Sequence, residues 1–357
     1  MKTIYTSIDI GSDTVKFIVS ELYKDKFNIL ASHTIKTKGI RKGLIVDANL
    51  VINTLKDGVK EINNNLGIEI KKAIVNVPSY NSKFIYTETS KEITSEDSKI
   101  TKEDINELIK KSVYSKIPND YELLTVQPLD FIIDSENKNP YPVGKTGKNI
   151  TLKAIIIATP KKNIYSVVSV MEASSIELTD ITISGLADYY EVKNDSTDKK
   201  VGAIINLGHE TTTVSIFNRG KIMNTETIQI GGRNIERDLA RVFNIDIFET
   251  RVLKEKFASA HKRFLSLTEV FEIKNTVGEV MKLSQLEVSE VVMARLSEIL
   301  ELAKKQILLL TKQKINYVIL TGGLTEIKHF KNLCFEIFGK DVIIYSVDTL
   351  GVRDNKY

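Results

Sequence analysis

Two short turns in the sequence combine residue types that can hold a phosphate group and a metal ion. The first lies in SIDIGSDTVKFIVS (residues 7–20) and the second in INLGHETTTVSIF (residues 205–217). In each, a glycine follows an apolar run and precedes hydroxyl-bearing residues. Glycine lets the backbone come close to a ligand, and successive N–H groups and hydroxyls at a tight turn can bind an anion. The pattern therefore predicts phosphate binding at both turns.

The two turns differ at the residue two positions before the glycine, which is Asp9 in the first and Asn206 in the second. A carboxylate at a strand end can hold Mg²⁺ through its waters. An asparagine can hydrogen-bond a metal-bound water, but it brings no charge and cannot act as a base. Asp9 and Asn206 are thus the candidate metal-binding residues. The missing second carboxylate favours slow or absent hydrolysis, and no catalytic residue is assigned.

Both turns are predicted to be tips of β-hairpins, because strand-like runs lie on either side of them. Phosphate loops of dinucleotide-binding and P-loop folds instead join a strand to a helix. A single hairpin of this kind is weak evidence for phosphate binding, because most such turns simply connect two strands. Two such hairpins, together with a further glycine segment, Gly322–Gly323 in VILTGG, are stronger evidence. Together the three predict two phosphate clamps that face each other across a cleft, with Gly322–Gly323 under a base and ribose.

An enzyme of another class remains an alternative, namely a small-molecule kinase or phosphatase. Such an enzyme needs an acid to activate its acceptor, and Asp188 and Glu210 are the candidates. An acid at a strand or loop end is more often solvated or capping. The tripeptide GKT at 144–146 is not a P-loop, because Asn139 stands where the motif needs a glycine.

The composition fits an ordinary soluble globular protein, with 42% hydrophobic and 27% charged residues in 357. A formal net charge of +4, with scattered lysines, does not support nucleic-acid binding. The single cysteine, Cys334, excludes a disulfide framework within the chain, fits a reducing cytoplasm and is predicted to be buried. The long apolar helix expected at 284–312 has a broad face typical of a protein core rather than of a membrane helix.

The chain divides into two similar halves with a polar insert. Each half begins with strand, turn, strand and strand and then continues into helices, which indicates a weak internal duplication. Residues 79–160 change character and predict an inserted α+β subdomain, in which Thr101 and Asp104 mark a helix start. Helices are expected at 48–65, 161–174, 234–243, 247–257 and 324–339. The overall prediction is α/β, with two similar lobes.

These motifs resemble the actin-like ATPase superfamily and, within it, the FtsA family of bacterial cell-division proteins. DIGSDTVK is similar to the first phosphate loop, INLGHETTTVSIF to the second and VILTGG to the adenosine motif. GIRKGLIVDANLVINTLKDGVKEI, ITKEDINELIKKS, YELLTVQPLDFIID, NPYPVG, GGRNIERDLARVF and LGVRDNKY resemble further FtsA segments in the same order. The resemblance implies an actin-like (ribonuclease-H-like) two-lobed fold, with duplicated mixed sheets flanked by helices and an inserted subdomain 1C.

The resemblance also implies a division into subdomains and a set of binding residues. The expected subdomains are 1A (1–78 and 161–190), 1C (79–160), 2A (191–234 and 310–345) and 2B (235–309), with 346–357 returning toward 1A. The expected cofactor-binding residues are Asp9, Gly11, Ser12, Asp13, Thr14, Lys16, Asn206, Gly208, His209, Glu210, Thr211, Thr212, Gly231, Gly232, Lys254, Gly322, Gly323 and Leu324.

In function, the resemblance implies a protein that binds ATP or ADP with Mg²⁺, forms filaments and links the FtsZ ring to the cell membrane at the division site. It would act at the cytoplasmic face of the membrane and bind the FtsZ C-terminal peptide, which the resemblance places on subdomain 2B. FtsA chains usually continue past the LGVRD segment into a terminal helix and a membrane anchor, so contact with the membrane is expected only through a helix that this chain lacks. A peptide-binding adaptor of pilus assembly, like PilM, is the alternative within the superfamily.

The chain departs from the family pattern at three positions. Asn206 replaces the second-loop Asp, His209 replaces a Gly, and Arg251 stands where an acid commonly approaches the ribose. His209 adds bulk where N–H groups should approach phosphate. Together with the missing carboxylate, this predicts at most a weak ATPase.

Overall fold

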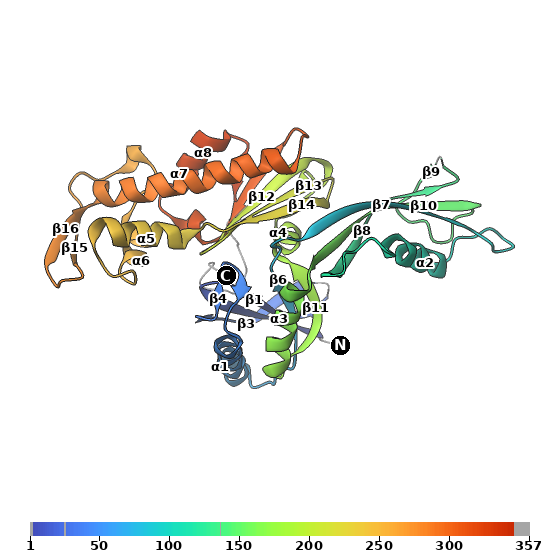
Figure 1. Ribbon diagram of the computed structural model, residues 1–357, viewed down its shortest axis with the longest axis horizontal. Coiled ribbons are helices and arrows are strands. Elements are labelled where there is room, and N and C mark those ends of the chain that lie inside the picture. Colours follow the sequence, from blue (N-terminus) through green and yellow to red (C-terminus); the bar gives the residue numbers. More distant parts are fainter. Residues whose placement is uncertain (1–2, 25, 136, 346–357) are drawn as a thin grey trace.

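The computed structural model describes residues 3–24, 26–135 and 137–345, and the segment expected to return toward 1A (346–357) lies outside them. Two lobes and a side arm make up the molecule (Figure 1). The first lobe lies below the second in that view, and the arm extends to the right. Each lobe contains one five-stranded sheet, and the arm contains a four-stranded sheet.

The two five-stranded sheets have the same connectivity, which confirms the predicted duplication. In each, the first strand pairs antiparallel with the second and parallel with a later strand, and the second strand pairs antiparallel with the third. The first sheet runs in the order β11 (Glu177–Ile183), β6 (Lys72–Val77), β1 (Thr3–Ile10), β2 (Thr14–Tyr23) and β3 (Lys26–Lys36). The second runs β18 (Val342–Ile344), β17 (Tyr317–Thr321), β12 (Val201–Leu207), β13 (Thr212–Asn218) and β14 (Lys221–Ile228).

Helices of the first lobe pack on its sheet through apolar faces. The predicted helix at 48–65 is α1 (Ala48–Leu66); it begins at the Asp47 N-cap and ends at Gly67, whose φ of 64° is left-handed. Its buried residues include Val51, Leu55 and Ile62. The other elements are α3 (Lys161–Ala173), α4 (Ser184–Val192) and a hairpin of β4 (Ile40–Arg41) and β5 (Leu44–Ile45).

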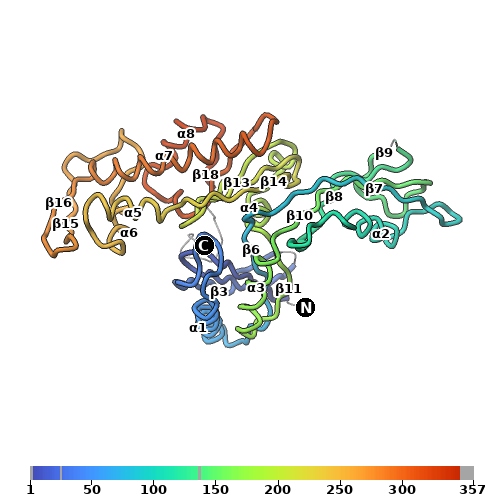
Figure 2. Tube along the Cα trace, in the orientation of Figure 1, coloured from blue at the N-terminus to red at the C-terminus, as the bar shows by residue number. Residues whose placement is uncertain are grey.

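The arm is the predicted insert, and the chain enters it through β7 and returns through β10, which lie side by side (Figure 2). Its helix starts as expected, because Thr101 and Asp104 form a capping box. It has a small core of its own around Ile100, Leu108 and Ile150. The elements are β7 (Lys83–Glu92), α2 (Lys102–Val113), β8 (Tyr121–Ile133), β9 (Asn137–Lys138) and β10 (Asn149–Pro160).

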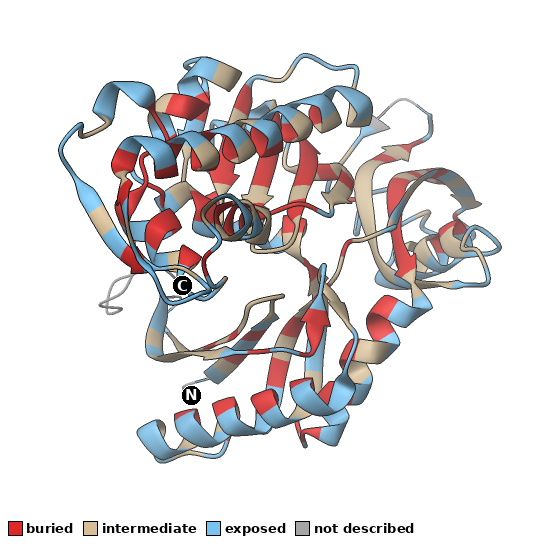
Figure 3. Cartoon of the chain, turned by 60° about the vertical axis from the view of Figure 1, so that its left-hand side comes forward, coloured by how far each residue is buried: buried red, intermediate tan, exposed pale blue. Residues whose placement is uncertain are grey.

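The second lobe is built around a long helix laid over its sheet. In Figure 3 buried residues line the sheets, while the outward faces of the helices are exposed. Cys334 is buried, as predicted. The helices are α5 (Gly232–Phe243), α6 (Thr250–Val252), α7 (Gln285–Leu310) and α8 (Phe330–Phe338), with short helical turns η1 (Thr197–Lys199), η2 (Leu253–Phe257, a π-helix), η3 (Lys262–Phe264) and η4 (Gly323–Glu326). A hairpin of β15 (Val270–Lys274) and β16 (Val280–Ser284) completes it.

Two of the expected helices are wrong as single elements. The helix expected at 324–339 is divided into η4 and α8, because Ile327 is extended (ψ 134°) and His329 takes a left-handed φ of 62°. The helix expected at 247–257 begins only at Thr250 and continues as the π-helix η2. For α7, Val288, Leu296 and Ile307 are buried as expected of a core helix. Among the described residues, none of the helices has the length and apolar character needed to span a membrane.

Candidate functional site

The two predicted turns have nearly identical backbones at the tips of the β1–β2 and β12–β13 hairpins. Gly11 N donates to Thr14 O at 3.0 Å, and Gly208 N donates to Thr211 O at 2.9 Å. A Cβ on either glycine would lie 2.9 Å from that same carbonyl oxygen. Both turns therefore need glycine for the same steric reason, and both are hairpins, as the sequence predicts.

The second turn is braced by two other predicted glycine segments. Gly232 N donates to Gly208 O at 3.0 Å, so the start of α5 is fastened to the turn. A Cβ on Gly231 would lie 2.6 Å from Gly208 O, and one on Gly322 would lie 2.5 Å from Leu207 O. Gly322 also has a left-handed φ of 95°. The structure thus brings three predicted segments together around one turn.

A buried ion pair lies beside these glycines. Lys254 Nζ and Glu236 Oε1 are 2.5 Å apart, and their side chains are only 5% and 7% exposed. A Cβ on Gly232 would lie 3.2 Å from Leu324 and 3.4 Å from Lys254 Nζ, whereas a Cβ on Gly323 would have no neighbour within 4 Å. The predicted residues Gly232, Lys254 and Leu324 therefore meet, and Gly323 keeps open space above it.

Glu236 was not among the residues expected from the sequence. Its signal was its place in α5, because Glu236 shares the buried face with Ile235 and Leu239. A carboxylate on the apolar face of a helix needs a partner, and Lys254 supplies it.

Near the end of β12, just before the second turn, Asn206 is hydrogen-bonded to Asp188 of α4. Asn206 Nδ2 donates to the two carboxylate oxygens at 3.0 and 3.2 Å. The pKa of Asp188 is raised to about 7, mainly by desolvation and also by the charge of Asp9, while the Asn206 hydrogen bond and the charge of Lys16 act in the opposite direction. Asp188, weighed above as an acid for a kinase, is therefore a poorly solvated carboxyl at the junction of the two lobes.

The metal-side candidates, Asp9 and Asn206, end equivalent strands. Asp9 is exposed. Thr321 pairs with Asn206 across β12 and β17, and its buried Oγ1 has no partner among the described residues. No group of three or more His, Cys, Asp or Glu residues in the described part of the chain could by itself hold a metal ion. The donors present fit Mg²⁺, which keeps several waters and takes further oxygens from a bound phosphate.

The hydroxyls of the two turns are used differently. Ser12 Oγ accepts a hydrogen bond from Gly43 N at 2.9 Å, and its side chain keeps its own hydrogen free to donate. Thr212 is fully buried and donates to Ile230 O at 2.8 Å. Thr212 thus fixes the second turn against the segment before α5, while Thr211 and Thr14 occupy equivalent positions where the turns close.

Three other expected residues lie where the lobes meet. Asp13 contacts Arg251 at 2.7 Å, and Glu210 accepts from Lys42 N at 2.6 Å. His209 Nε2 is 3.9 Å from both Asp13 Oδ1 and Glu236 Oε2. The three departures from the family pattern, at 206, 209 and 251, therefore all fall at this junction.

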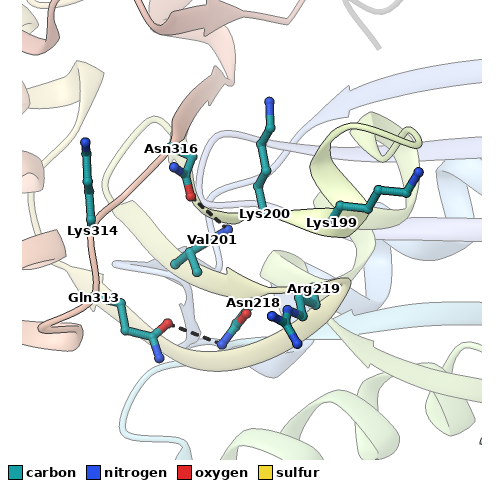
Figure 4. A pocket seen from close by; sticks show the side chains of 8 residues that line it. All are labelled: Lys199, Lys200, Val201, Asn218, Arg219, Gln313, Lys314 and Asn316. Carbon is teal, nitrogen blue, oxygen red and sulfur yellow. Dashed lines mark hydrogen bonds between the residues drawn. The ribbon is translucent and has the colours of Figure 1, made fainter.

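A pocket of about 570 Å³ lies at the other end of β12 and contains none of the expected residues. It is lined by Lys199, Lys200, Val201, Asn218, Arg219, Gln313, Lys314 and Asn316 (Figure 4). In that view the three lysine side chains extend outward and do not converge. The lining includes four cationic side chains and no carboxylate, whereas cations and carboxylates are paired at the junction of the lobes.

Comparison with known families decides which protein family this architecture represents. The family model "Cell division protein FtsA" matches residues 203–357, and the model "SHS2 domain inserted in FTSA" matches residues 82–158. Together they account for the second lobe and the arm. The chain belongs to the FtsA family.

Curated FtsA relatives extend the match to the first lobe. The cell division protein FtsA of Bacillus subtilis is 26% identical over 99% of this chain and 81% of its own length. That of Streptococcus pneumoniae is 25% identical over 98% of this chain and 77% of its own length. This FtsA family member is accordingly an actin-like protein of cell division, as the motifs predict.

Solved structures of lower identity show the fold. A PilM–PilN type IV pilus biogenesis complex matches with a TM-score of 0.64 at 12% identity, covering 96% of this chain and 88% of that one. MreB5 of Spiroplasma citri bound to ADP matches with a TM-score of 0.60 at 14% identity, covering 97% and 92%. The expected actin-like fold of this FtsA family member, with its inserted domain, is confirmed.

Proposed function

We propose that this protein binds ATP or ADP, with Mg²⁺, between its two lobes, and that hydrolysis is weak. The observation that supports this most is the pair of matched turns at Gly11 and Gly208, which close with the same hydrogen bond on opposite lobes. A solved structure of the same fold, MreB5, carries ADP. The proposal uses the residues expected from the sequence and adds Glu236 as the group that holds Lys254.

Each part of the nucleotide has candidate partners in this arrangement. Backbone N–H groups of the two turns, with Ser12 and Lys16, would bind the phosphates. Lys254, Gly232, Gly323 and Leu324 would border the adenosine, where the space over Gly323 suits a flat ring. Bound Mg²⁺ would neutralise phosphate charge, with Asp9 holding its waters from the first lobe and Asn206, the neighbour of Thr321, from the second.

Weak hydrolysis follows from the state of the groups at the strand ends. Asn206 cannot take a proton, and its amide is engaged with Asp188. Asp188, whose pKa is raised to about 7, could accept a proton, but both of its carboxylate oxygens already accept from the Asn206 amide. We expect Asn206→Asp to raise turnover when Mg²⁺ is present. An unchanged rate in a variant that still binds nucleotide would contradict the weak-catalysis proposal.

In the cell, we propose that the protein forms filaments and links the FtsZ ring to the inner face of the membrane at the division site. The subdomain boundaries expected above (1A 1–78 and 161–190, 1C 79–160, 2A 191–234 and 310–345, 2B 235–309) remain part of this proposal. The match of the inserted domain to residues 82–158 supports an arm of this extent. The family membership favours self-association and binding to another protein of cell division.

Calorimetric titration with ATP, with and without Mg²⁺, tests the binding proposal. We expect Mg²⁺-dependent binding, and we expect Asp9→Asn to weaken the effect of Mg²⁺ while leaving metal-free binding unchanged. Asp57→Asn is the matched control, because Asp57 is an exposed carboxylate on α1, away from both turns. Absence of binding by folded protein, or an Asp9→Asn variant that responds fully to Mg²⁺, would overturn the assignment of these residues.

The partner is tested separately with peptides. We expect the protein to bind an FtsZ C-terminal peptide and not an N-terminal peptide of a pilus protein. The opposite preference would favour the PilM-like adaptor, which shares the fold at 12% identity.

A further inference from the structure

The two turns carry a second equivalence, in the acids Asp13 and Glu210 of the set expected at the nucleotide site. In each, an acid stands two residues after the glycine: Asp13 follows Gly11, and Glu210 follows Gly208. Both side chains are largely buried, with exposed fractions of 20% and 12%. Since the turns superimpose in their hydrogen bonding, the two carboxylates occupy equivalent positions on opposite lobes.

Each acid reaches a donor of the opposite lobe. Asp13, in the first lobe, accepts from Arg251 Nη2 at 2.7 Å and Nη1 at 3.4 Å, and Arg251 lies on α6 of the second lobe. Glu210, in the second lobe, accepts from Lys42 N at 2.6 Å, and Lys42 lies at the tip of the β4–β5 hairpin of the first lobe. Two-pronged guanidinium–carboxylate contacts and bonds to charged acceptors are the stronger class of hydrogen bonds.

The β4–β5 tip touches both turns at once. Lys42 and Gly43 have left-handed φ values of 51° and 77°, as a two-residue hairpin turn of this hand requires. This conformation directs Lys42 N to Glu210 and Gly43 N to Ser12 Oγ at 2.9 Å. Lys42 Nζ adds a bond to Gln229 Oε1 at 2.9 Å, which is also in the second lobe.

Each acid also has a partner within its own lobe, which provides an internal control. Lys36 of β3 contacts Asp13 at 2.7 Å, and Arg233 of α5 lies 3.4 Å from Glu210. These same-lobe contacts balance the charge of the acids but join nothing across the junction. Each of the two carboxylates therefore has one partner in the opposite lobe, which can hold the lobes together, and one partner in its own lobe, which cannot.

We propose that Asp13 and Glu210 form a reciprocal latch, in which each turn grips the opposite lobe and keeps the lobes closed without nucleotide. Arg251, which departs from the family pattern, supplies the charged half of this latch. The latch acts at the turns that a phosphate group would approach, so it sets the resting lobe spacing that any nucleotide meets.

A distance measurement on nucleotide-free protein tests the latch. Spin labels are attached at Lys56→Cys on α1 and Glu290→Cys on α7, two exposed positions on different lobes. The native Cys334 is fully buried, and burial raises the pKa of its thiol to about 12, so it stays unlabelled. The interlobe distance distribution is then recorded by pulsed electron paramagnetic resonance.

We expect Asp13→Ala, Arg251→Ala and Glu210→Ala each to raise the ratio of long to short distances about tenfold, which corresponds to ~1.4 kcal/mol. Lys36→Ala and Arg233→Ala, the same-lobe controls, should leave the distribution as in the parent protein. The double variant Asp13→Ala with Arg251→Ala should open no further than either single variant, because both remove the same contact.

Several outcomes would overturn the latch. They are unchanged distances in all three latch variants, or a Lys36→Ala effect as large as that of Arg251→Ala. If Asp13→Ala fails to fold, salt serves instead: raising NaCl from 0.1 to 1 M shortens the screening length from about 10 to 3 Å and should open the parent but not Arg251→Ala. Because no nucleotide is added, the latch and the nucleotide proposal can fail independently.

Discussion

The turns at residues 10–14 and 207–211 share one backbone design but differ in what surrounds them. Both close with a glycine N–H bonded to a carbonyl three residues on, at 3.0 and 2.9 Å. The second turn is enclosed by other glycines, since Gly231 and Gly322 each pack against its backbone. At the first turn, a Cβ on Gly11 would meet only Thr14 O, and the neighbouring Gly43 bonds to the Ser12 side chain rather than packing against the turn's backbone. Duplication thus preserved the turn itself and altered its support.

The strand-end residues before the turns, Asp9 and Asn206, also differ in what surrounds them. Asp9 ends its strand in an exposed position, whereas Asn206 ends the equivalent strand against Asp188. An aspartate in place of Asn206 would set two carboxylates side by side, and like charges at this distance repel. In this chain the amide therefore replaces a repulsion with a hydrogen bond, which favours a well-packed second turn over a doubly charged metal site.

The largest expected effect separates the support of the two turns. Gly231→Ala should lower the free energy of unfolding by at least about 3 kcal/mol, because its Cβ would lie 2.6 Å from Gly208 O and 2.7 Å from His209 O, and backbone atoms cannot move aside. Gly11→Ala and Gly208→Ala, each with one contact at 2.9 Å, should cost about 1–2 kcal/mol and equal amounts. Urea unfolding of the three variants measures this, and a Gly231→Ala loss no greater than the other two would contradict the proposed bracing.

The next effect concerns the strand ends. Asn206→Asp should destabilise the metal-free protein by about 2 kcal/mol at pH 8, because the new carboxylate faces Asp188 without a donor between them. Adding Asp188→Asn to the same chain exchanges donor and acceptor and should restore most of the loss. Thermal unfolding of both variants, with and without Mg²⁺, checks this. Equal losses in the single and double variants would mean that the strain lies elsewhere.

The pH dependence of stability should show the state of Asp188. Its pKa is raised from the usual 3.8 to about 7, so the folded state holds a proton that the unfolded chain releases. The resulting stabilisation is complete below pH 3.8 and is lost as the pH rises through 7, with a slope of at most about 1.4 kcal/mol per pH unit between them.

Asp188→Asn removes this titration and is the matched variant. Its unfolding free energy should fall less than that of the parent protein between pH 4 and 7.5, as measured by urea melts. Parallel pH profiles for the two proteins would show that Asp188 stays charged and solvated when folded.

Much of the fold was predictable because local patterns agree with it. Alternating apolar runs mark β1, β2, β12 and β13, and helical spacing marks α1 and α7. The order of motifs was enough for the family. The failures lie where local sequence is ambiguous: KHFKNLCFEIFG reads as one helix with the residues before it, but His329 adopts a left-handed conformation that only the packed structure determines.

The site was predictable as a set of turns but not as a set of contacts. Glycines at 208, 231 and 322 are separated by up to 114 residues, and sequence alone cannot show that they enclose one turn. The bonds of Arg251 to Asp13 and of Lys42 to Glu210 depend on how two lobes approach each other. Such pairings are tertiary, and no spacing rule within one helix or strand gives them.

The smallest expected effect distinguishes the residues that directly follow the two glycines. His209→Gly should cost only about 0.5–1 kcal/mol of stability, mostly as backbone entropy, because among the described residues the nearest charged partners of its ring are Asp13 and Glu236, both at 3.9 Å. Removing the ring exposes the N–H groups of the second turn, so ADP affinity should rise a few-fold in calorimetry. Ser12→Gly, the equivalent change in the first turn, removes the hydroxyl that accepts from Gly43 N and should lower affinity. Opposite signs for the two variants would show that the second turn is obstructed and the first is not. Losses of the same size would instead make His209 a ligand, and the second turn a phosphate clamp that uses an imidazole where the first uses a hydroxyl.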